Sequence, residues 1–143
     1  MKQYRIDDID VGLKHQFSAD ITEEKLNAFT LVSGDVNPLH TNAEHAKRRG
    51  HPDVVVYGMM TASLYSTLVG VYLPGENALL QDIQTRFSRP VFVGDVLTVE
   101  GEVVDVHTLL KRIEIKAVIR NQHGQVVSKA RIHSGIDESE SSA

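Results

Sequence analysis

The sequence predicts a single α+β domain in which an antiparallel sheet wraps around one long apolar helix. Three observations carry this prediction. Residues 59–73 are apolar or small on every side, the residues after them alternate between apolar and polar, and 41% of the 143 residues are apolar, enough for one core. The predicted domain covers residues 1–136, and residues 137–143 form an acidic, serine-rich tail that we expect to be flexible.

The chain before the long helix contains strand and helix signals. Residues 13–18 are a short predicted strand. Thr22 is followed by two glutamates, which favours a helix start, and Gly34 ends this helix. Its apolar side chains recur at helical spacing, so we expect them in the core: Leu26, Ala28, Phe29, Leu31 and Val32.

Two further segments lead to the long helix. Pro38 lacks an amide hydrogen and restricts the residue before it, so residues 35–40 are predicted to form an ordered loop. A short helix is predicted over residues 43–49. The long helix, residues 59–73, is expected to be buried on all sides, and at about 22 Å it is too short to cross a membrane.

Alternating residues predict four strands after the long helix, at 80–87, 96–106, 113–120 and 126–133. Turn sequences between them predict that they follow one another as an antiparallel meander. Such a sheet leaves an edge strand exposed, and pairing two edges about a twofold axis would cover it. We therefore expect a homodimer or a higher oligomer.

Composition excludes several classes of function. The net charge is -4, but three of the acids lie in the last seven residues, so the body shows no sign of nucleic-acid or membrane binding. The chain has no cysteine, which excludes a disulfide framework, a thiolate metal site and a cysteine nucleophile. No apolar run of signal-peptide length follows the basic residues near the start, so we expect a cytoplasmic protein.

Among the seven histidines, His40 stands apart because Asp35 precedes it by five residues and Pro38 restricts the chain between them. On the residues alone, this carboxylate and imidazole could be a general acid and base around one water, part of a catalytic triad, or metal ligands. A triad lacks a G-x-S-x-G sequence, and a metal site lacks a third ligand at a recognised spacing. His51 is ambiguous, and the others are expected to be solvated or hydrogen-bonded: His15, His45, His107, His123 and His133.

Three sequence blocks accompany this pair: SGDVNPLH at residues 33–40, YGMM at 57–60 and RFSRPVFVGD at 86–95. Together they resemble the MaoC-like dehydratases, a hotdog-fold family that includes the (R)-specific enoyl-CoA hydratases. The likeness covers roughly residues 17–132. It implies a hotdog domain and a hydro-lyase that adds water to trans-2-enoyl thioesters to give (R)-3-hydroxyacyl products, or runs the reverse dehydration.

The resemblance also implies roles for individual residues. Asp35 and His40 correspond to the family's catalytic pair, which holds one water between its side chains. Gly58 corresponds to a glycine whose backbone binds the thioester oxygen. Ser66 corresponds to a serine that helps to arrange the aspartate, and Asn37 is assigned with these residues to the substrate site.

Tyr57, also assigned to the substrate site, departs from the family pattern. Most members have histidine there, and tyrosine is larger and neutral near pH 7. We therefore expect Tyr57→His to alter acyl chain-length preference more than the chemical step.

The implied substrate is an acyl thioester of coenzyme A or of an acyl carrier protein. Basic side chains are candidates for contacts with the phosphates of coenzyme A, with ordinary surface charge as the alternative: Lys47, Arg48, Arg49, Arg86 and Arg89. We expect no metal or redox cofactor, and coenzyme A or phosphopantetheine enters only as part of the substrate. The alternative functions are a 3-hydroxyacyl-carrier-protein dehydratase, a noncatalytic hotdog protein that binds acyl thioesters, and a thioesterase, which the Asp35 and His40 block disfavours.

Overall fold

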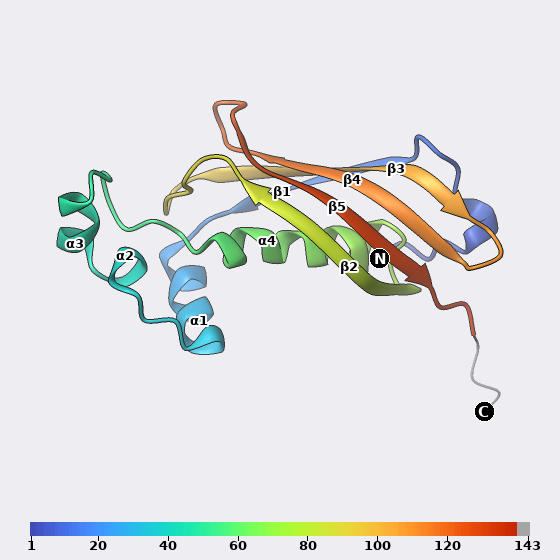
Figure 1. Ribbon diagram of the computed structural model, residues 1–143, viewed down its shortest axis with the longest axis horizontal. Helices are drawn as coiled ribbons and strands as arrows, with labels where there is room; N and C mark the ends of the chain where they lie inside the picture. Colours follow the sequence, from blue (N-terminus) through green and yellow to red (C-terminus); the bar gives the residue numbers. More distant parts are fainter. Residues whose placement is uncertain (140–143) are drawn as a thin grey trace.

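A five-stranded antiparallel sheet curves around helix α4 in the computed structural model, which describes residues 1–139 (Figure 1). The strand order is β1-β3-β4-β5-β2. The bounds are β1 (Lys14–Asp20), β2 (Ala78–Phe87), β3 (Val96–His107), β4 (Arg112–Arg120) and β5 (Val126–Ile136). The predicted α+β architecture, a sheet around one long helix, is confirmed.

Strands β3, β4 and β5 form the predicted meander, but β2 does not belong to it. β2 pairs with β5, from Ala78 opposite Ile136 to Phe87 opposite Ser128, at the edge away from β1. The meander prediction is wrong here because residues 88–95 do not make a tight turn. Instead they cross between strands that are not neighbours, and on the way the Val91 carbonyl accepts a hydrogen bond from the Val56 N–H at 2.8 Å.

The α-helices lie between β1 and β2 in the chain, as the sequence predicts, with one difference in their bounds. The elements are a 3-10 turn η1 (Ile6–Asp8), α1 (Glu23–Ser33), α2 (Pro38–Thr41), α3 (Ala43–Arg48), α4 (Gly58–Thr67) and a π-helical continuation η2 (Leu68–Tyr72). The Thr22 side chain caps α1, and Gly34 ends it with φ +70°. The difference is that Pro38 starts the short helix α2 rather than staying in a loop, because a helix's first residue needs no amide hydrogen.

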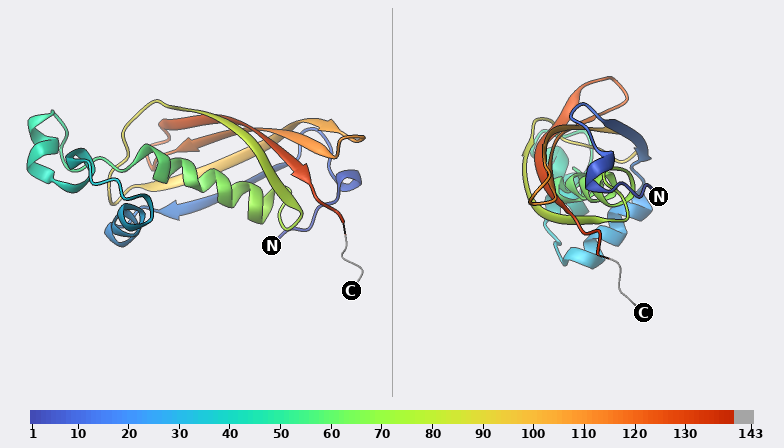
Figure 2. Two further views of the ribbon diagram at one scale, coloured as in Figure 1. Left: turned by 60° about the horizontal axis from the view of Figure 1, so that its bottom comes forward. Right: turned by 90° about the vertical axis from the view of Figure 1, so that its right-hand side faces the viewer.

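The core lies between α4 and the concave face of the sheet (Figure 2). Tyr65 and Leu68 face the sheet and are 1% and 0% exposed. The helix approaches β3 so closely that a Cβ at Gly101 would lie 2.7 Å from Leu68 Cδ2. This close approach fixes how deeply α4 sits in the sheet.

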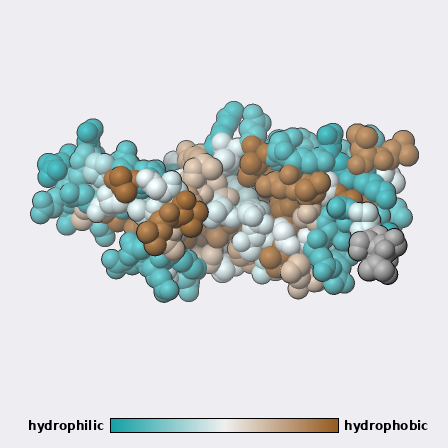
Figure 3. All heavy atoms as spheres, turned by 90° about the horizontal axis from the view of Figure 1, so that it is seen from below, coloured by the Kyte–Doolittle hydropathy of each residue, from teal (hydrophilic) through white to brown (hydrophobic). Residues whose placement is uncertain are grey.

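Two helices expose apolar side chains that were expected in the core. Leu31 and Val32 of α1 are 86% and 83% exposed, and Met59 of α4 is 66% exposed. These predictions are wrong because, within residues 1–139, α1 buries only Leu26 fully and α4 buries Met60, Thr61, Ala62 and Tyr65 but leaves Met59 exposed. Figure 3 shows apolar side chains at the surface between hydrophilic regions.

The start of the predicted flexible tail is held against the body. The Glu138 carboxylate, 7% exposed, accepts a hydrogen bond from the Ile6 N–H at 2.6 Å and pairs with Arg5 and Lys111, each at 3.3 Å. The Ile6 amide, followed by the two cations, lowers the pKa of Glu138. The flexibility of the tail stays a prediction, and residues 140–143 of it lie outside the described residues.

Within residues 1–139, no helix combines the length and the apolar character needed to cross a membrane.

Candidate active site

The Asp35 loop is organised by its own side chains. The Asp35 carboxylate accepts a hydrogen bond from the Asn37 N–H at 3.0 Å, and the Asn37 side chain accepts one from the Leu39 N–H at 3.0 Å, which caps α2. Both are turns typical of Asp and Asn. The loop therefore fixes the carboxylate of Asp35 and starts the helix that carries His40.

His40 has a defined orientation. Its Nδ1 lies 2.5 Å from the Val55 carbonyl oxygen, and the Leu39 carbonyl accepts a hydrogen bond from the Val55 N–H at 3.0 Å. A carbonyl oxygen can only accept, so Nδ1 carries the hydrogen and Nε2 of the neutral ring is free to accept a proton. This hydrogen bond fixes both the tautomer and the orientation of the half-buried imidazole.

Tyr57 contacts both residues of the predicted pair. Its hydroxyl donates to the Asp35 backbone carbonyl at 2.5 Å and is hydrogen-bonded to Thr30 Oγ1 at 2.8 Å. Its ring centroid lies 4.1 Å from that of His40 and 5.0 Å from that of Phe29. At 2% exposure, Tyr57 is a buried link between α1, the Asp35 loop and the start of α4, where it is the N-cap residue.

A pocket of about 350 Å³ lies beside His40, and Asp35 is not among the residues that line it. His40, Gly58, Thr61, Phe87 and Arg89 line it, together with Ser88 and apolar residues of the neighbouring segments. The Tyr57 side chain does not cap α4, so the N–H groups of the first turn start at Gly58 with no side-chain acceptor. These N–H groups at the positive end of the helix suit an oxygen that gains negative charge.

Residues 7–126 match the family described as MaoC like domain. The chain belongs to this family. It is 38% identical over 95 residues to the (R)-specific enoyl-CoA hydratase of Aeromonas caviae, covering 66% of this chain and 71% of the relative. It is 31% identical over 100 residues to the 3-hydroxybutyryl-CoA dehydratase of Methylorubrum extorquens AM1, covering 70% of this chain and 64% of the relative.

Solved structures of two hydratases share the fold of this MaoC-like domain. The unliganded R-hydratase PhaJ1 of Pseudomonas aeruginosa superposes with a TM-score of 0.88 at 30% identity, over 94% of this chain and 86% of that one. The A. caviae (R)-hydratase involved in PHA biosynthesis gives 0.85 at 30% identity, over 90% and 97%. The hotdog fold implied by the sequence blocks is confirmed.

The four predicted arginines of this MaoC-like domain lie in three different places. Arg89 lines the pocket with His40. Arg86 lies over the sheet with cations of β4 and β5, and exposed Arg48 and Arg49 lie at the end of α3. Of the four, Arg89 is therefore the one that a substrate in this pocket would meet.

Four other predicted site residues do not line the pocket: Asp35 and Tyr57, described above, and Ser66 and Asn37. Ser66 lies two turns beyond Gly58 on the exposed side of α4, and among the described residues no hydrogen bond joins it to Asp35. Asn37 uses its side-chain oxygen to cap α2. The assignments of Ser66 and Asn37 stay predictions.

Sequence reasoning missed two threonines at this site. Thr30 supports Tyr57 as described above. Thr61, 2% exposed, lines the pocket, and its hydroxyl has no hydrogen-bond partner among the described residues. No sequence motif marks either residue, because their roles depend on which side of a helix faces the site.

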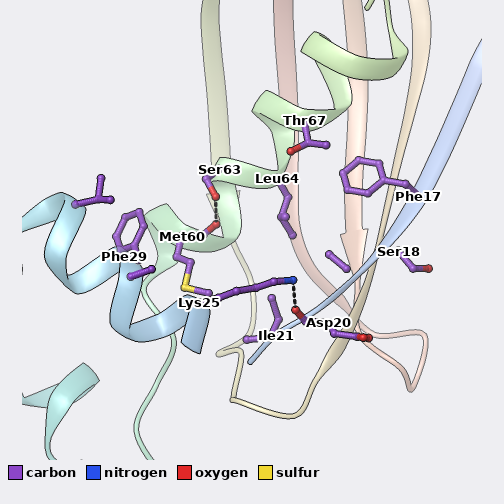
Figure 4. Close-up of a pocket in the computed structure, with 13 residues that line it drawn as sticks. Phe17, Ser18, Asp20, Ile21, Lys25, Phe29, Met60, Ser63, Leu64 and Thr67 are labelled. Atoms are coloured by element: carbon purple, nitrogen blue, oxygen red, sulfur yellow. Dashed lines mark hydrogen bonds between the residues drawn. The ribbon is translucent and has the colours of Figure 1, made fainter. Parts of the chain in front are cut away.

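A larger cavity, about 720 Å³, is a groove between β1, α1 and α4 (Figure 4). Phe17, Phe29, Val32, Met60 and Leu64 give it a mainly apolar lining. The apolar residues of α1 were the feature of the sequence that could have indicated this groove, but they were predicted to lie in the core. The groove lies beside Phe29, which contacts Tyr57.

Three of the histidines expected to play ordinary roles do so. His15 is hydrogen-bonded to the Tyr4 hydroxyl at 2.9 Å, and burial followed by nearby Lys2 lowers its pKa. His107 accepts from a backbone N–H, and His133 lies between Asp82 and Glu114. In the part of the chain that the structure describes, no three carboxylate or imidazole side chains are placed to hold a metal ion.

Proposed function

We propose that this protein is a hydro-lyase that adds water to trans-2-enoyl thioesters to give (R)-3-hydroxyacyl thioesters, and that also catalyses the reverse dehydration. The observation that carries the proposal is the arrangement of Asp35 and His40 around Tyr57, beside a pocket that begins at the uncapped helix residue Gly58. The names of the hydratase and dehydratase relatives support the same reaction class.

Each group has a task that its contacts allow. The Asp35 carboxylate and His40 Nε2 hold one water, and one of them takes a proton from it as its oxygen bonds to C3 of the substrate. The C2–C3 π bond breaks, and the proton taken from the water is passed on to C2, so that both groups end the step in the protonation state in which they began. Meanwhile negative charge on the thioester oxygen is stabilised by the Gly58 N–H at the start of α4.

A homodimer is part of this proposal. β2 is an edge strand, and unlike β3 and β4 it does not alternate between buried and exposed residues. Leu79, Leu80, Ile83 and Phe87 are 39% to 58% exposed, although Ile83 pairs with the fully buried Ile132. A second copy packed along β2 would cover this apolar edge.

The dimer has a direct test. Light scattering after size-exclusion chromatography should give twice the 15.9 kDa chain mass. Ile83→Lys should shift the protein toward the monomer, whereas Lys14→Glu on the opposite edge strand β1 should not. A monomeric wild type would contradict this part of the proposal.

The reaction is tested with crotonyl-CoA, by following loss of the absorbance of the conjugated enoyl thioester. Loss without free thiol supports hydration, whereas release of thiol would identify a thioesterase. Asp35→Asn and His40→Gln should each lower kcat by about 100-fold or more while leaving Tm close to that of the wild type. His107→Gln, a histidine of β3 outside the pocket, serves as the matched control.

The same assay separates the remaining alternatives. A faster reaction with the enoyl thioester of an acyl carrier protein than with crotonyl-CoA would identify a carrier-protein dehydratase. Binding of both thioesters without turnover would identify a noncatalytic binding protein. Action without a metal or redox cofactor and a cytoplasmic location stay predictions, and full activity after treatment with a chelator would support the first.

A further inference from the structure

Thr61 is buried in the wall of the active-site pocket with an unused hydroxyl group. It is 2% exposed and lines the pocket with His40 and Gly58. Its Oγ1 is the one buried side-chain polar atom within residues 1–139 that has no hydrogen-bond partner. Leaving such a group without a partner costs about 1–3 kcal/mol, so its presence needs a reason.

The usual partner of a helical hydroxyl is absent for Thr61. Threonine and serine in helices commonly donate to a carbonyl three or four residues earlier. Ser63 does so to the Met60 carbonyl at 2.5 Å, and Thr30 Oγ1, which shares its hydrogen with the Tyr57 hydroxyl, lies 3.1 Å from the Leu26 carbonyl. The Thr61 hydroxyl makes no such bond, although the Tyr57 carbonyl accepts the Thr61 N–H at 3.1 Å.

The position of Thr61 on α4 indicates what its hydroxyl can reach. Side chains of a helix lean toward its N-terminus and cover the preceding turn. For Thr61 that turn begins at Gly58, three residues earlier, and both residues line the same pocket. Thr61 and Gly58 therefore lie next to each other on one wall of the pocket, and each carries a hydrogen-bond donor.

We propose that the Thr61 hydroxyl binds the substrate by donating a hydrogen bond to the thioester carbonyl oxygen, beside the Gly58 N–H. A carbonyl oxygen has two lone pairs and accepts both bonds. The second donor adds to the stabilisation of the charge that this oxygen gains when water attacks C3. This inference rests on the proposed hydratase function, because it names a further group that handles the same substrate.

Thr61→Val tests the proposal because valine has nearly the shape of threonine but no hydroxyl. The kcat for crotonyl-CoA should fall about 10- to 100-fold. This fall is no larger than that usually seen when one oxyanion donor is removed, because the Gly58 N–H remains. Tm should stay the same or rise, since the hydroxyl has no partner to lose in the free protein. Thr61→Ser keeps the hydroxyl and should retain kcat within about threefold.

The control is Thr98→Val in β3, which makes the same chemical change outside the pocket and should leave kcat unchanged. An unchanged kcat for Thr61→Val would overturn the proposal. A Tm several degrees lower with normal kcat would also overturn it, because the hydroxyl would then be part of the fold, for instance through a buried water.

Calorimetric binding of butyryl-CoA, a saturated thioester that cannot be hydrated, separates this inference from the hydratase proposal. Thr61→Val should weaken its Kd about fivefold, the equivalent of one hydrogen bond. If wild-type protein binds butyryl-CoA but hydrates no enoyl thioester, the hydratase proposal fails and the Kd still decides the role of Thr61. If wild-type protein binds no thioester, both proposals fail.

Discussion

Tyr57→Phe tests whether the buried tyrosine positions the catalytic pair, because it removes one hydroxyl and keeps the ring against His40. The hydroxyl of Tyr57 donates to the Asp35 carbonyl and is hydrogen-bonded to Thr30 Oγ1. In the variant, Thr30 keeps the Leu26 carbonyl as an acceptor at 3.1 Å. Because Asp35 is exposed, water can replace the lost bond at its carbonyl.

The expected stability loss is therefore small. One net hydrogen bond is worth about 1 kcal/mol, which lowers Tm by about 2–4 °C in a domain of this size. With a typical stability of 5–15 kcal/mol, the variant stays folded at 25 °C. The effect on catalysis should be larger, because the Asp35 backbone loses its anchor and a displacement of about 1 Å can cost 100-fold in rate. We expect kcat to fall 10- to 100-fold.

The matched control is Tyr65→Phe. Tyr65 is also on α4 and buried, at 1% exposure, and its hydroxyl donates to Ser128 Oγ at 2.8 Å, away from the Asp35 loop. It should lose similar stability without losing kcat for crotonyl-CoA. Equal kcat values for Tyr57→Phe and Tyr65→Phe would refute the positioning role, and the prediction that Tyr57→His mainly alters chain-length preference would then be the better account of Tyr57.

Two further predictions concern the pocket and the tail. Gly58→Ala should fold with unchanged or higher Tm, because its Cβ would lie in ordinary contact with the Phe87 ring at 3.4 Å. It should lower kcat/KM, because the added methyl group obstructs the pocket at the helix start. A fall in Tm with normal kcat/KM would mark Gly58 as only a turn residue. Glu138→Gln should lower Tm at neutral pH, as followed by thermal unfolding. The pKa of Glu138 is lowered in the folded protein, so its contribution to stability is present above the ordinary glutamate pKa of about 4.3 and is lost as the pH falls through the lowered value. The curves of Tm against pH for the wild type and for Glu138→Gln should therefore converge in acid. Parallel curves across the whole pH range would contradict the role given to this carboxylate.

Local signals in the sequence predicted the elements well because their causes are local. The Thr22 cap and the left-handed Gly34 set both ends of α1, and the turn at residues 121–124 joins β4 to β5 as expected. The place of β2 could not be predicted in this way. Its neighbour β5 lies about 40 residues further along the chain, and the choice of that edge depends on how residues 88–95 pass the start of α4.

Burial was predicted less well because the spacing of apolar residues does not show what they face. Leu31 and Val32 have the helical spacing of core residues, yet they are exposed in a single chain. Likewise, the sequence blocks identified Asp35 and His40, but the hydrogen bond from Tyr57 to the Asp35 carbonyl depends on a side chain that crosses from α4 to the loop. A resemblance assigns roles to matched positions, and Tyr57 is where this sequence differs from the pattern.

The first turn of α4 combines two polar side chains whose different environments indicate different tasks. The Tyr57 hydroxyl has two hydrogen-bond partners within the chain, so these bonds stabilise the folded loop. Removal of the hydroxyl should therefore lower both Tm and kcat. The Thr61 hydroxyl has no partner within residues 1–139, so the folded protein alone gains nothing from it, and its loss should be visible in kcat and ligand affinity but not in Tm. A residue that positions the site and a residue that binds the substrate can therefore be distinguished one turn apart on the same helix, by whether the protein itself satisfies the polar group.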